Sequence, residues 1–153
     1  MRLSQEEIYT IYSKLYELGI EWCLGPETLL NTILNRETDR LDIAVNYVDV
    51  DRLHEFKDLL AELGIENVFV VPYVGFSRRC VYVQALPCIS IEDSILGICM
   101  DYNAKYFEVI KELLNISRDR LDIVYLRVMC RRLGICDKLC EKVNLCIDVG
   151  AQY

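Results

Sequence analysis

Apolar residues recur at helical spacing over the first 18 positions and in short continuous runs after them. The segment from Ser4 to Leu18 begins with a capping-box pattern, in which Glu7 follows Ser4, and keeps its apolar residues on one face. It predicts an amphipathic helix. Four later runs, rich in β-branched and aromatic residues, predict strands over 20–24, 41–47, 68–74 and 80–86. Gly75 and the two residues after it predict a hairpin-like turn between the last two strands.

The second half of the chain is helical in pattern. Ser90 begins a second capping pattern, and helices are predicted around 118–133 and 137–147. Gly134 separates these two helices and predicts a tight turn that makes them an antiparallel pair.

The order of these elements is α-β-α-β-α-β-β, followed by helices. It predicts an α/β (α+β) fold, with a small mixed β-sheet of about four strands, flanking helices and a helical C-terminal tail. We expect 1–89 to form the α/β core and 90–153 to pack on it as a helical extension, in a single domain. The alternation of the strands places five side chains in the core of the sheet: Trp22, Ile43, Val45, Val70 and Val83.

The composition indicates a globular protein with an acidic surface. Hydrophobic residues make up 53% of the chain, which is too many for a disordered one. No apolar run approaches the roughly 20 residues of a membrane span, and the first 20 positions lack a signal-peptide pattern, so we expect a cytoplasmic protein with no membrane contact. The net charge of −7 argues against a nucleic-acid partner, because such binding depends on basic charge.

Eight cysteines are many for a cytoplasmic chain of this length. None has CxxC spacing and His54 is the only histidine, so the close ligand pairs of a zinc site are missing. Most cysteines can be small core residues. The alternative is internal disulfides of the kind found in hyperthermophiles, a source with which the many Ile, Val, Tyr, Arg and Glu residues are compatible. Cys130 and Cys140 flank Gly134 at similar distances, which makes a disulfide between them the specific hypothesis.

Several polar residues converge between positions 24 and 43. A predicted strand, Gly25 and a helix start succeed one another, and the N–H groups and dipole of a helix start can hold an anion. Thr28 adds a hydroxyl group. Asp42 stands on the following strand, close to Asp39. The separation of 14 positions from Thr28 to Asp42 lets a short helix return the chain beside the first strand.

Each of these residues also has a purely structural interpretation. Gly25 followed by proline is equally typical of an ordinary strand-to-helix turn. Asp42 can be a strand residue paired with Arg36 or Arg40. We expect His54 to be an exposed helix residue without a role, since no partner cluster surrounds it in the sequence.

The order and spacing of the motifs resemble those of the nucleotidyltransferase superfamily, particularly its small prokaryotic members related to toxin–antitoxin and abortive-infection transferases. Positions 24–30, LGPETLL, resemble the turn that binds the triphosphate, and positions 36–43, RETDRLDI, resemble the segment that holds divalent metal. Positions 87–93 look like the family's apolar-Pro segment, and positions 117–123 are similar to its later Lys/Arg-Asp-x-x-Asp helix. The resemblance covers most of 8–135.

The resemblance implies a site that binds a nucleotide and Mg²⁺. It implies Asp42 and Asp39 as catalytic carboxylates, with Asp42 as the metal ligand. The nucleotide contacts that it implies are Gly25, Thr28, Arg36 and Arg40.

The chain departs from the family at its carboxylates. In the register we prefer, Arg40 stands at the first metal-binding Asp and Asp42 at the second; in the other register Asp42 comes first and Ala44 replaces the second. The strand predicted over 80–86 supplies no third acid. Mg²⁺ is held by carboxylates and substrate phosphates, so we expect at most weak metal binding unless Asp39 shifts into the metal position through a local bulge.

Three functions follow from these observations. The leading interpretation is a catalytically weakened or inactive nucleotidyltransferase-like protein that binds a nucleotide or a protein partner. The second is an active metal-dependent enzyme that moves NMP from NTP to an RNA or protein acceptor. The third is a disulfide-stabilised structural or interaction protein that uses the fold as a scaffold. A second carboxylate within about 4–6 Å of Asp42 would favour the active enzyme.

Overall fold

The strands form one mixed sheet in the computed structural model, which describes residues 4–37, 40–55, 57–83 and 86–147. Within this part of the chain five strands lie in the order β3-β2-β1-β5-β4. β1 pairs with β2 and β4 with β5 in antiparallel fashion, whereas β2–β3 and β1–β5 are parallel. This confirms the α/β class with one strand more than expected. The strands are β1 (Trp22–Leu24), β2 (Leu41–Asn46), β3 (Ile65–Val71), β4 (Val81–Val83) and β5 (Leu86–Cys88).

The predicted hairpin after β3 is wrong. Gly75 does adopt a left-handed φ of 90°, but a short 3-10 helix, η2 (Phe76–Arg79), follows it and carries the chain away from β3. The carboxylate of Glu21 holds this turn, since it accepts the N–H of Gly75 at 2.8 Å and the N–H and hydroxyl of Ser77 at 3.1 and 2.6 Å. β4 then pairs with β5, which follows it in the chain, so β3 and β4 form opposite edges of the sheet.

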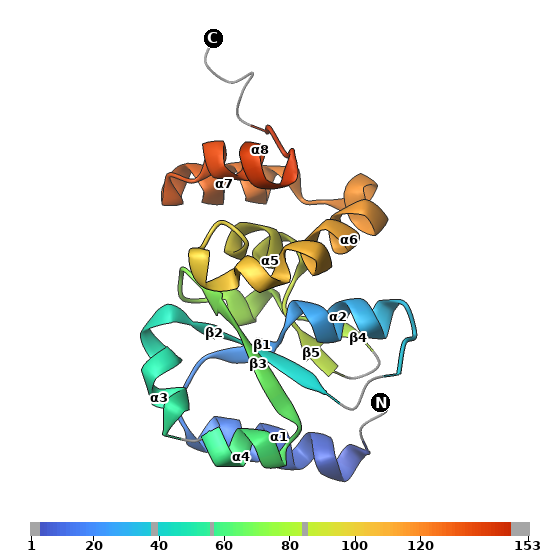
Figure 1. The fold of residues 1–153 in the computed structure, drawn as a ribbon, viewed down its shortest axis with the longest axis vertical. Helices are drawn as coiled ribbons and strands as arrows, with labels where there is room; N and C mark the ends of the chain where they lie inside the picture. The colour runs from blue at the N-terminus through green and yellow to red at the C-terminus, as the bar shows by residue number, and fades with distance from the viewer. Residues whose placement is uncertain (1–3, 38–39, 56, 84–85, 148–153) are drawn as a thin grey trace.

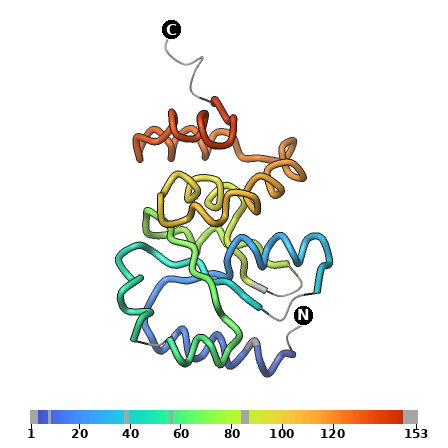
Figure 2. Tube along the Cα trace, viewed as in Figure 1, coloured from blue at the N-terminus to red at the C-terminus, as the bar shows by residue number. Residues whose placement is uncertain are grey.

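Helices cover both faces of the sheet (Figure 1). α1 (Gln5–Glu17) and α4 (Lys57–Glu62) lie below it in this view, and α3 (Val50–His54) joins β2 to α4. α2 (Pro26–Ile33), α5 (Ile91–Gly97) and α6 (Phe107–Ser117) lie above it. α7 (Ile123–Leu133) and α8 (Cys136–Val143) form the outermost layer, beyond α5 (Figure 2). The remaining 3-10 helices are η1 (Tyr47–Asp49), η3 (Asp101–Tyr106) and η4 (Arg118–Arg120).

The local sequence signals explain where several helices begin. Ser4 and Glu7 form the predicted capping box: each side chain accepts the backbone N–H of the other, at 3.1 and 3.2 Å. Ser90 caps α5 and accepts the Asp93 N–H at 3.0 Å. Within the described residues no helix is long and apolar enough to cross a bilayer.

A single hydrophobic core joins the two halves of the chain. It includes Leu15 of α1, Ile43 of β2 and Leu126 of α7. The division into an α/β core of residues 1–89 and a helical extension of residues 90–153 stays a prediction. Of the five side chains expected in the core of the sheet, Ile43, Val45 and Val70 are buried. Trp22 and Val83 are only half-buried, since they lie at the start of β1 and on the edge strand β4.

Six of the cysteines form three disulfides: Cys23–Cys80, Cys130–Cys136 and Cys140–Cys146. The other two, Cys88 and Cys99, are buried thiols. Disulfides occur mainly in oxidising compartments and in hyperthermophile cytosol, so the cytoplasmic location stays a prediction.

The predicted disulfide between Cys130 and Cys140 is wrong, although the turn on which it was based is present. α7 ends at a left-handed Gly134 with φ 68°, and α8 begins only two residues later. Cys136 is therefore the cysteine nearest to Cys130 across the turn, with 4.8 Å between the Cα atoms. Cys140 lies one turn farther along α8 and pairs with Cys146 beyond the end of that helix.

Candidate anion-binding site at the start of α2

β1 passes through Gly25 directly into α2. Gly25 is the N-cap residue in an extended conformation, and Pro26 takes the first helical position, where an N–H is not needed. The Gly25 N–H donates to the carbonyl oxygen of Asp42 at 2.8 Å, which fixes the turn against β2. The predicted succession of strand, glycine and helix start is therefore present, and it lies beside Asp42.

The carboxylate of Asp42 occupies the N-terminus of α2. Its Oδ2 accepts the Glu27 N–H at 3.0 Å, and its Oδ1 accepts the Thr28 N–H at 2.8 Å and the Thr28 hydroxyl at 2.6 Å. These are the donors that the sequence offers to a phosphate. An aspartate from the neighbouring strand thus caps a helix whose own N-cap residue has no side chain.

The same contact explains why a glycine stands at position 25. A Cβ on Gly25 would lie 2.2 Å from Asp42 Oδ2. The φ of Gly25 is −84°, which any residue can adopt, so space and not backbone conformation requires the glycine.

Burial dominates the electrostatics of the site. Asp42 is 1% exposed, and this burial raises the pKa of its carboxyl group, while the hydrogen bonds from Thr28 and from the Glu27 N–H oppose the rise. Burial and the Asp42 charge also raise the pKa of Tyr106. The Tyr106 hydroxyl has no hydrogen-bond partner among the described residues. Partial burial and then the Asp42 charge raise the pKa of Glu27.

Glu27, in the first turn of α2, is the acid next to Asp42. Its carboxyl group feels the charge of Asp42, and Asp42 already uses both oxygens for hydrogen bonds. The described residues hold no group of three or more His, Cys, Asp or Glu side chains that could bind a metal ion. The site therefore presents a capped carboxylate beside a second negative charge.

The two arginines implied as nucleotide contacts reach other carboxylates. Arg36 forms an ion pair with Glu112 of α6 at 2.8 Å, and Arg40 with Glu66 of β3 at 3.3 Å. Asp39 lies outside the described residues. The pairing of β2 with β3 does shift register between Leu41 and Asp42. The extra residue lies in β3, so this irregularity is not a bulge in β2. His54 is exposed at the end of α3, as expected.

A second buried carboxylate, Asp93, lies between η2, α5 and α7. Its Oδ1 accepts the hydroxyls of Tyr73 and Tyr125, and its Oδ2 accepts the Ser90 hydroxyl at 2.7 Å. The Arg79 guanidinium lies 3.6 Å from the centre of the Tyr125 ring and 3.9 Å from Asp93. Sequence reasoning missed this cluster, because no local pattern links residues so far apart in the chain.

Arg79 also joins the two segments that the family resemblance singled out in the second half of the chain. It lies 3.3 Å from Glu92, within the first segment, and 3.7 Å from Asp122, within the second. Asp122 in turn caps α7 by accepting the Tyr125 N–H at 3.0 Å. These charged residues fasten α7 to α5, which is a structural role.

Comparisons of this chain with protein-family models, with curated proteins and with solved structures found no match. The resemblance to nucleotidyltransferases therefore rests on the motifs and their order alone, and it remains a hypothesis.

Proposed function

We propose that this protein is a nucleotidyltransferase-like protein that does not transfer nucleotides and acts by binding a protein partner. One observation carries the proposal. The N–H groups and hydroxyl at the start of α2, which would hold a triphosphate, already hold the carboxylate of Asp42. The anion-binding position is filled by the protein's own anion.

A phosphate could use these donors only by displacing Asp42. The displaced carboxylate would remain buried without its donors, and leaving a buried charge uncompensated costs roughly 3–5 kcal/mol. Glu27 adds repulsion, since it stands in the first turn of the same helix. Nucleotide binding at this position is therefore disfavoured on two grounds.

The residues present do not fit Mg²⁺. The ion requires near-octahedral oxygen ligands and keeps several waters. Asp42 is only 1% exposed, and its carboxylate oxygens already accept three hydrogen bonds. The site therefore supports no metal-dependent step.

Exposed aromatic side chains support a protein partner. Tyr9 and Tyr16 are 73% and 84% exposed and stand seven residues apart on α1, so they share one face of that helix. Tyrosine is enriched at protein–protein interfaces, where its ring buries apolar area and its hydroxyl remains able to hydrogen-bond.

The proposal is tested by incubating the protein with each of four labelled NTPs, Mg²⁺ or Mn²⁺, and a cell extract as the source of acceptors. We expect no labelled product. Product that forms with the wild type and disappears in Asp42→Ala would overturn the proposal.

A variant designed to restore the site makes the absence of labelled product informative. Arg40→Asp restores the paired carboxylates of the preferred register, and Glu27→Gln removes the repelling charge. Because Asp42 still holds the donors at the start of α2, we expect the double variant to bind a non-hydrolysable NTP with Mg²⁺ no more tightly than the wild type, and a clear gain in affinity would overturn the proposal. Glu17→Gln, a change at the distant end of α1, is the matched control and is expected to change nothing.

A further inference from the structure

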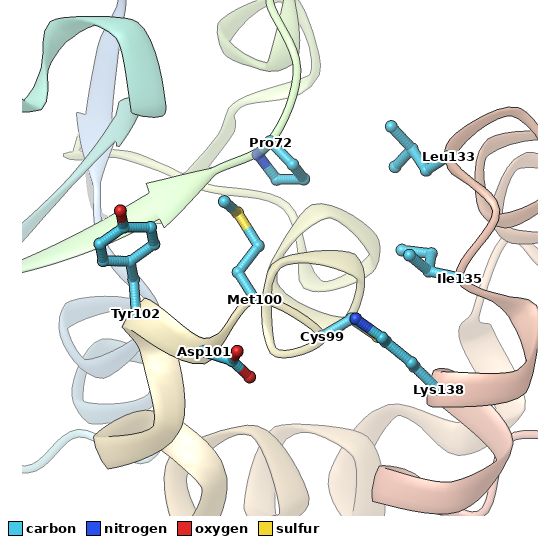
Figure 3. Close-up of a pocket in the computed structure, with 8 residues that line it drawn as sticks. All are labelled: Pro72, Cys99, Met100, Asp101, Tyr102, Leu133, Ile135 and Lys138. Atoms are coloured by element: carbon cyan, nitrogen blue, oxygen red, sulfur yellow. The ribbon is translucent and has the colours of Figure 1, made fainter.

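A pocket of about 300 Å³ lies between the end of β3, η3 and the turn from α7 to α8 (Figure 3). This volume is at the lower end of the range of small-molecule sites. Pro72 and Met100 form one apolar wall, and Leu133 and Ile135 form the other. The pocket is therefore large enough for a small organic molecule and mainly apolar.

The pocket is separate from the site at α2. β1 ends at Leu24, which pairs with Ile43 near the start of β2, so the α2 site lies at that end of the sheet. β3 runs parallel to β2, and Pro72 follows its last residue, Val71. The two sites therefore lie at opposite ends of the sheet.

Positive charge gathers on one side of this pocket. Figure 3 shows the Lys138 ammonium pointing from α8 toward the Cys99 side of the pocket. Lys138 forms no ion pair with a carboxylate in the described part of the chain. Lys142, one turn later, donates to the Ile98 carbonyl at 3.3 Å. Burial raises the pKa of the Cys99 thiol to about 11, and the two ammonium groups oppose this rise. Both positive charges are therefore felt at Cys99, which lines the pocket.

Asp101 is the one acid among the lining residues of this pocket, and it pairs with Lys142 and not with Lys138. Its side chain is fully exposed to solvent, and its carboxylate lies 3.9 Å from Lys142. Lys138 thus remains the cation that a ligand in the pocket would meet.

We propose that this pocket binds a small apolar monocarboxylate, with the carboxylate on the Lys138 ammonium and the hydrocarbon body between the Pro72–Met100 and Leu133–Ile135 walls. A single ammonium suits a single negative charge. A phosphate would call for more donors, such as an arginine fork or successive backbone N–H groups, and the pocket lining has no arginine. Met100 can adapt to different hydrocarbon shapes, because its side chain is unbranched.

The disulfide Cys130–Cys136 preorganises the site. It closes the loop that carries both Leu133 and Ile135, and Lys138 follows two residues after it. A wall fixed in the unliganded protein loses less conformational entropy when a ligand binds. The affinity for the carboxylate should therefore fall when this disulfide is removed.

Calorimetric titration of the oxidised protein with octanoate tests the proposal. We expect saturable binding of one octanoate, with a dissociation constant of about 0.1–1 mM for a ligand of about ten non-hydrogen atoms. Lys138→Met keeps the length of the side chain and removes its charge; we expect it to weaken binding about tenfold or more. Lys14→Met, on α1 below the sheet, is the matched control and should leave the affinity unchanged.

Two further measurements separate the charge from the walls. Octan-1-ol, which lacks the carboxylate, should bind about tenfold more weakly than octanoate. Leu133→Trp fills the pocket from a half-buried position and should abolish binding while the protein keeps its circular dichroism spectrum. The proposal would be overturned if octanoate showed no saturable binding up to about 10 mM, a concentration at which even weak ligands bind. Equal affinities of the wild type and Lys138→Met would also overturn it.

Discussion

Asp42 and Thr28 form a closed pair between β2 and α2. The Thr28 N–H and hydroxyl both donate to Asp42 Oδ1, at 2.8 and 2.6 Å, and the Asp42 N–H donates back to the Thr28 hydroxyl oxygen at 3.2 Å. Both residues are buried, so bulk water cannot replace a lost partner. The pair fastens the first turn of α2 to the sheet.

Thr28→Val should destabilise the fold by about 1–3 kcal/mol, because it keeps the shape of the side chain and leaves buried polar groups of Asp42 without a partner. Urea unfolding at neutral pH measures the change. Thr28→Ser keeps the hydroxyl and is the control, with an expected loss of less than about 1 kcal/mol from the missing methyl group. Equal losses in the two variants would show that the hydroxyl contributes nothing.

Gly25→Ala should destabilise the fold by about 1–3 kcal/mol or more, because its Cβ would lie 2.2 Å from Asp42 Oδ2. The loss should be non-additive with Asp42→Ala, which removes the clashing carboxylate. A double-mutant cycle in urea measures this coupling. Additive losses would mean that the glycine is required for another reason.

The strands β1, β2 and β3 could be predicted from the sequence, whereas the pairing of β4 with β5 could not. All of β2, Leu41–Asn46, is buried, and a strand covered on both faces is mostly apolar, as this segment is apart from Asp42 and Asn46. β4 and β5 are three residues each, and alternation in such short segments does not reveal which strand is the neighbour. The turn at Gly75 therefore gave a wrong hairpin.

The candidate site could be predicted in position but not in chemistry. The spacing of Gly25, Thr28 and Asp42 indicated that they meet, and they do. Whether the carboxylate caps the helix or faces solvent depends on burial and side-chain direction, which composition and spacing do not specify. The tyrosine cluster around Asp93 gave no signal, since its partner Tyr125 lies 32 residues away.

The free energy of unfolding should fall as the pH rises above about 9. Burial raises the pKa of the Cys88 thiol to about 12 and of the Cys99 thiol to about 11, from an ordinary value of 9.0. Because the folded-state pKa values are raised, the stabilisation is fully present below the unfolded-state pKa near 9.0 and is lost as the pH rises through the folded-state values. Each thiol contributes a slope of at most about 1.4 kcal/mol per pH unit.

Urea unfolding at about pH 7, 9 and 10 measures this slope. The Cys88→Ala/Cys99→Ala variant lacks both thiols and should show a shallower dependence on pH above about 9. A slope identical to that of the wild type would mean that other groups, such as the tyrosines, cause the alkaline loss.

Removal of the disulfide Cys23–Cys80 should destabilise the protein more than removal of either C-terminal disulfide. Cys23 and Cys80 stand 57 residues apart in the chain, whereas the other pairs are separated by six residues. Loop-closure entropy then gives about 4 kcal/mol for the long loop and about 2 kcal/mol for each short one. Thermal unfolding of the three double-alanine variants ranks these losses.

The pairing itself needs a direct measurement, because the ranking assumes it. Mass spectrometry of peptides cleaved without reduction should find the three disulfides of the structure, with Cys88 and Cys99 as free thiols. A peptide joining Cys130 to Cys140 would contradict the pairing around the α7–α8 turn. It would also detach Leu133 and Ile135 from their six-residue loop, so the preorganised wall of the carboxylate pocket depends on the same result.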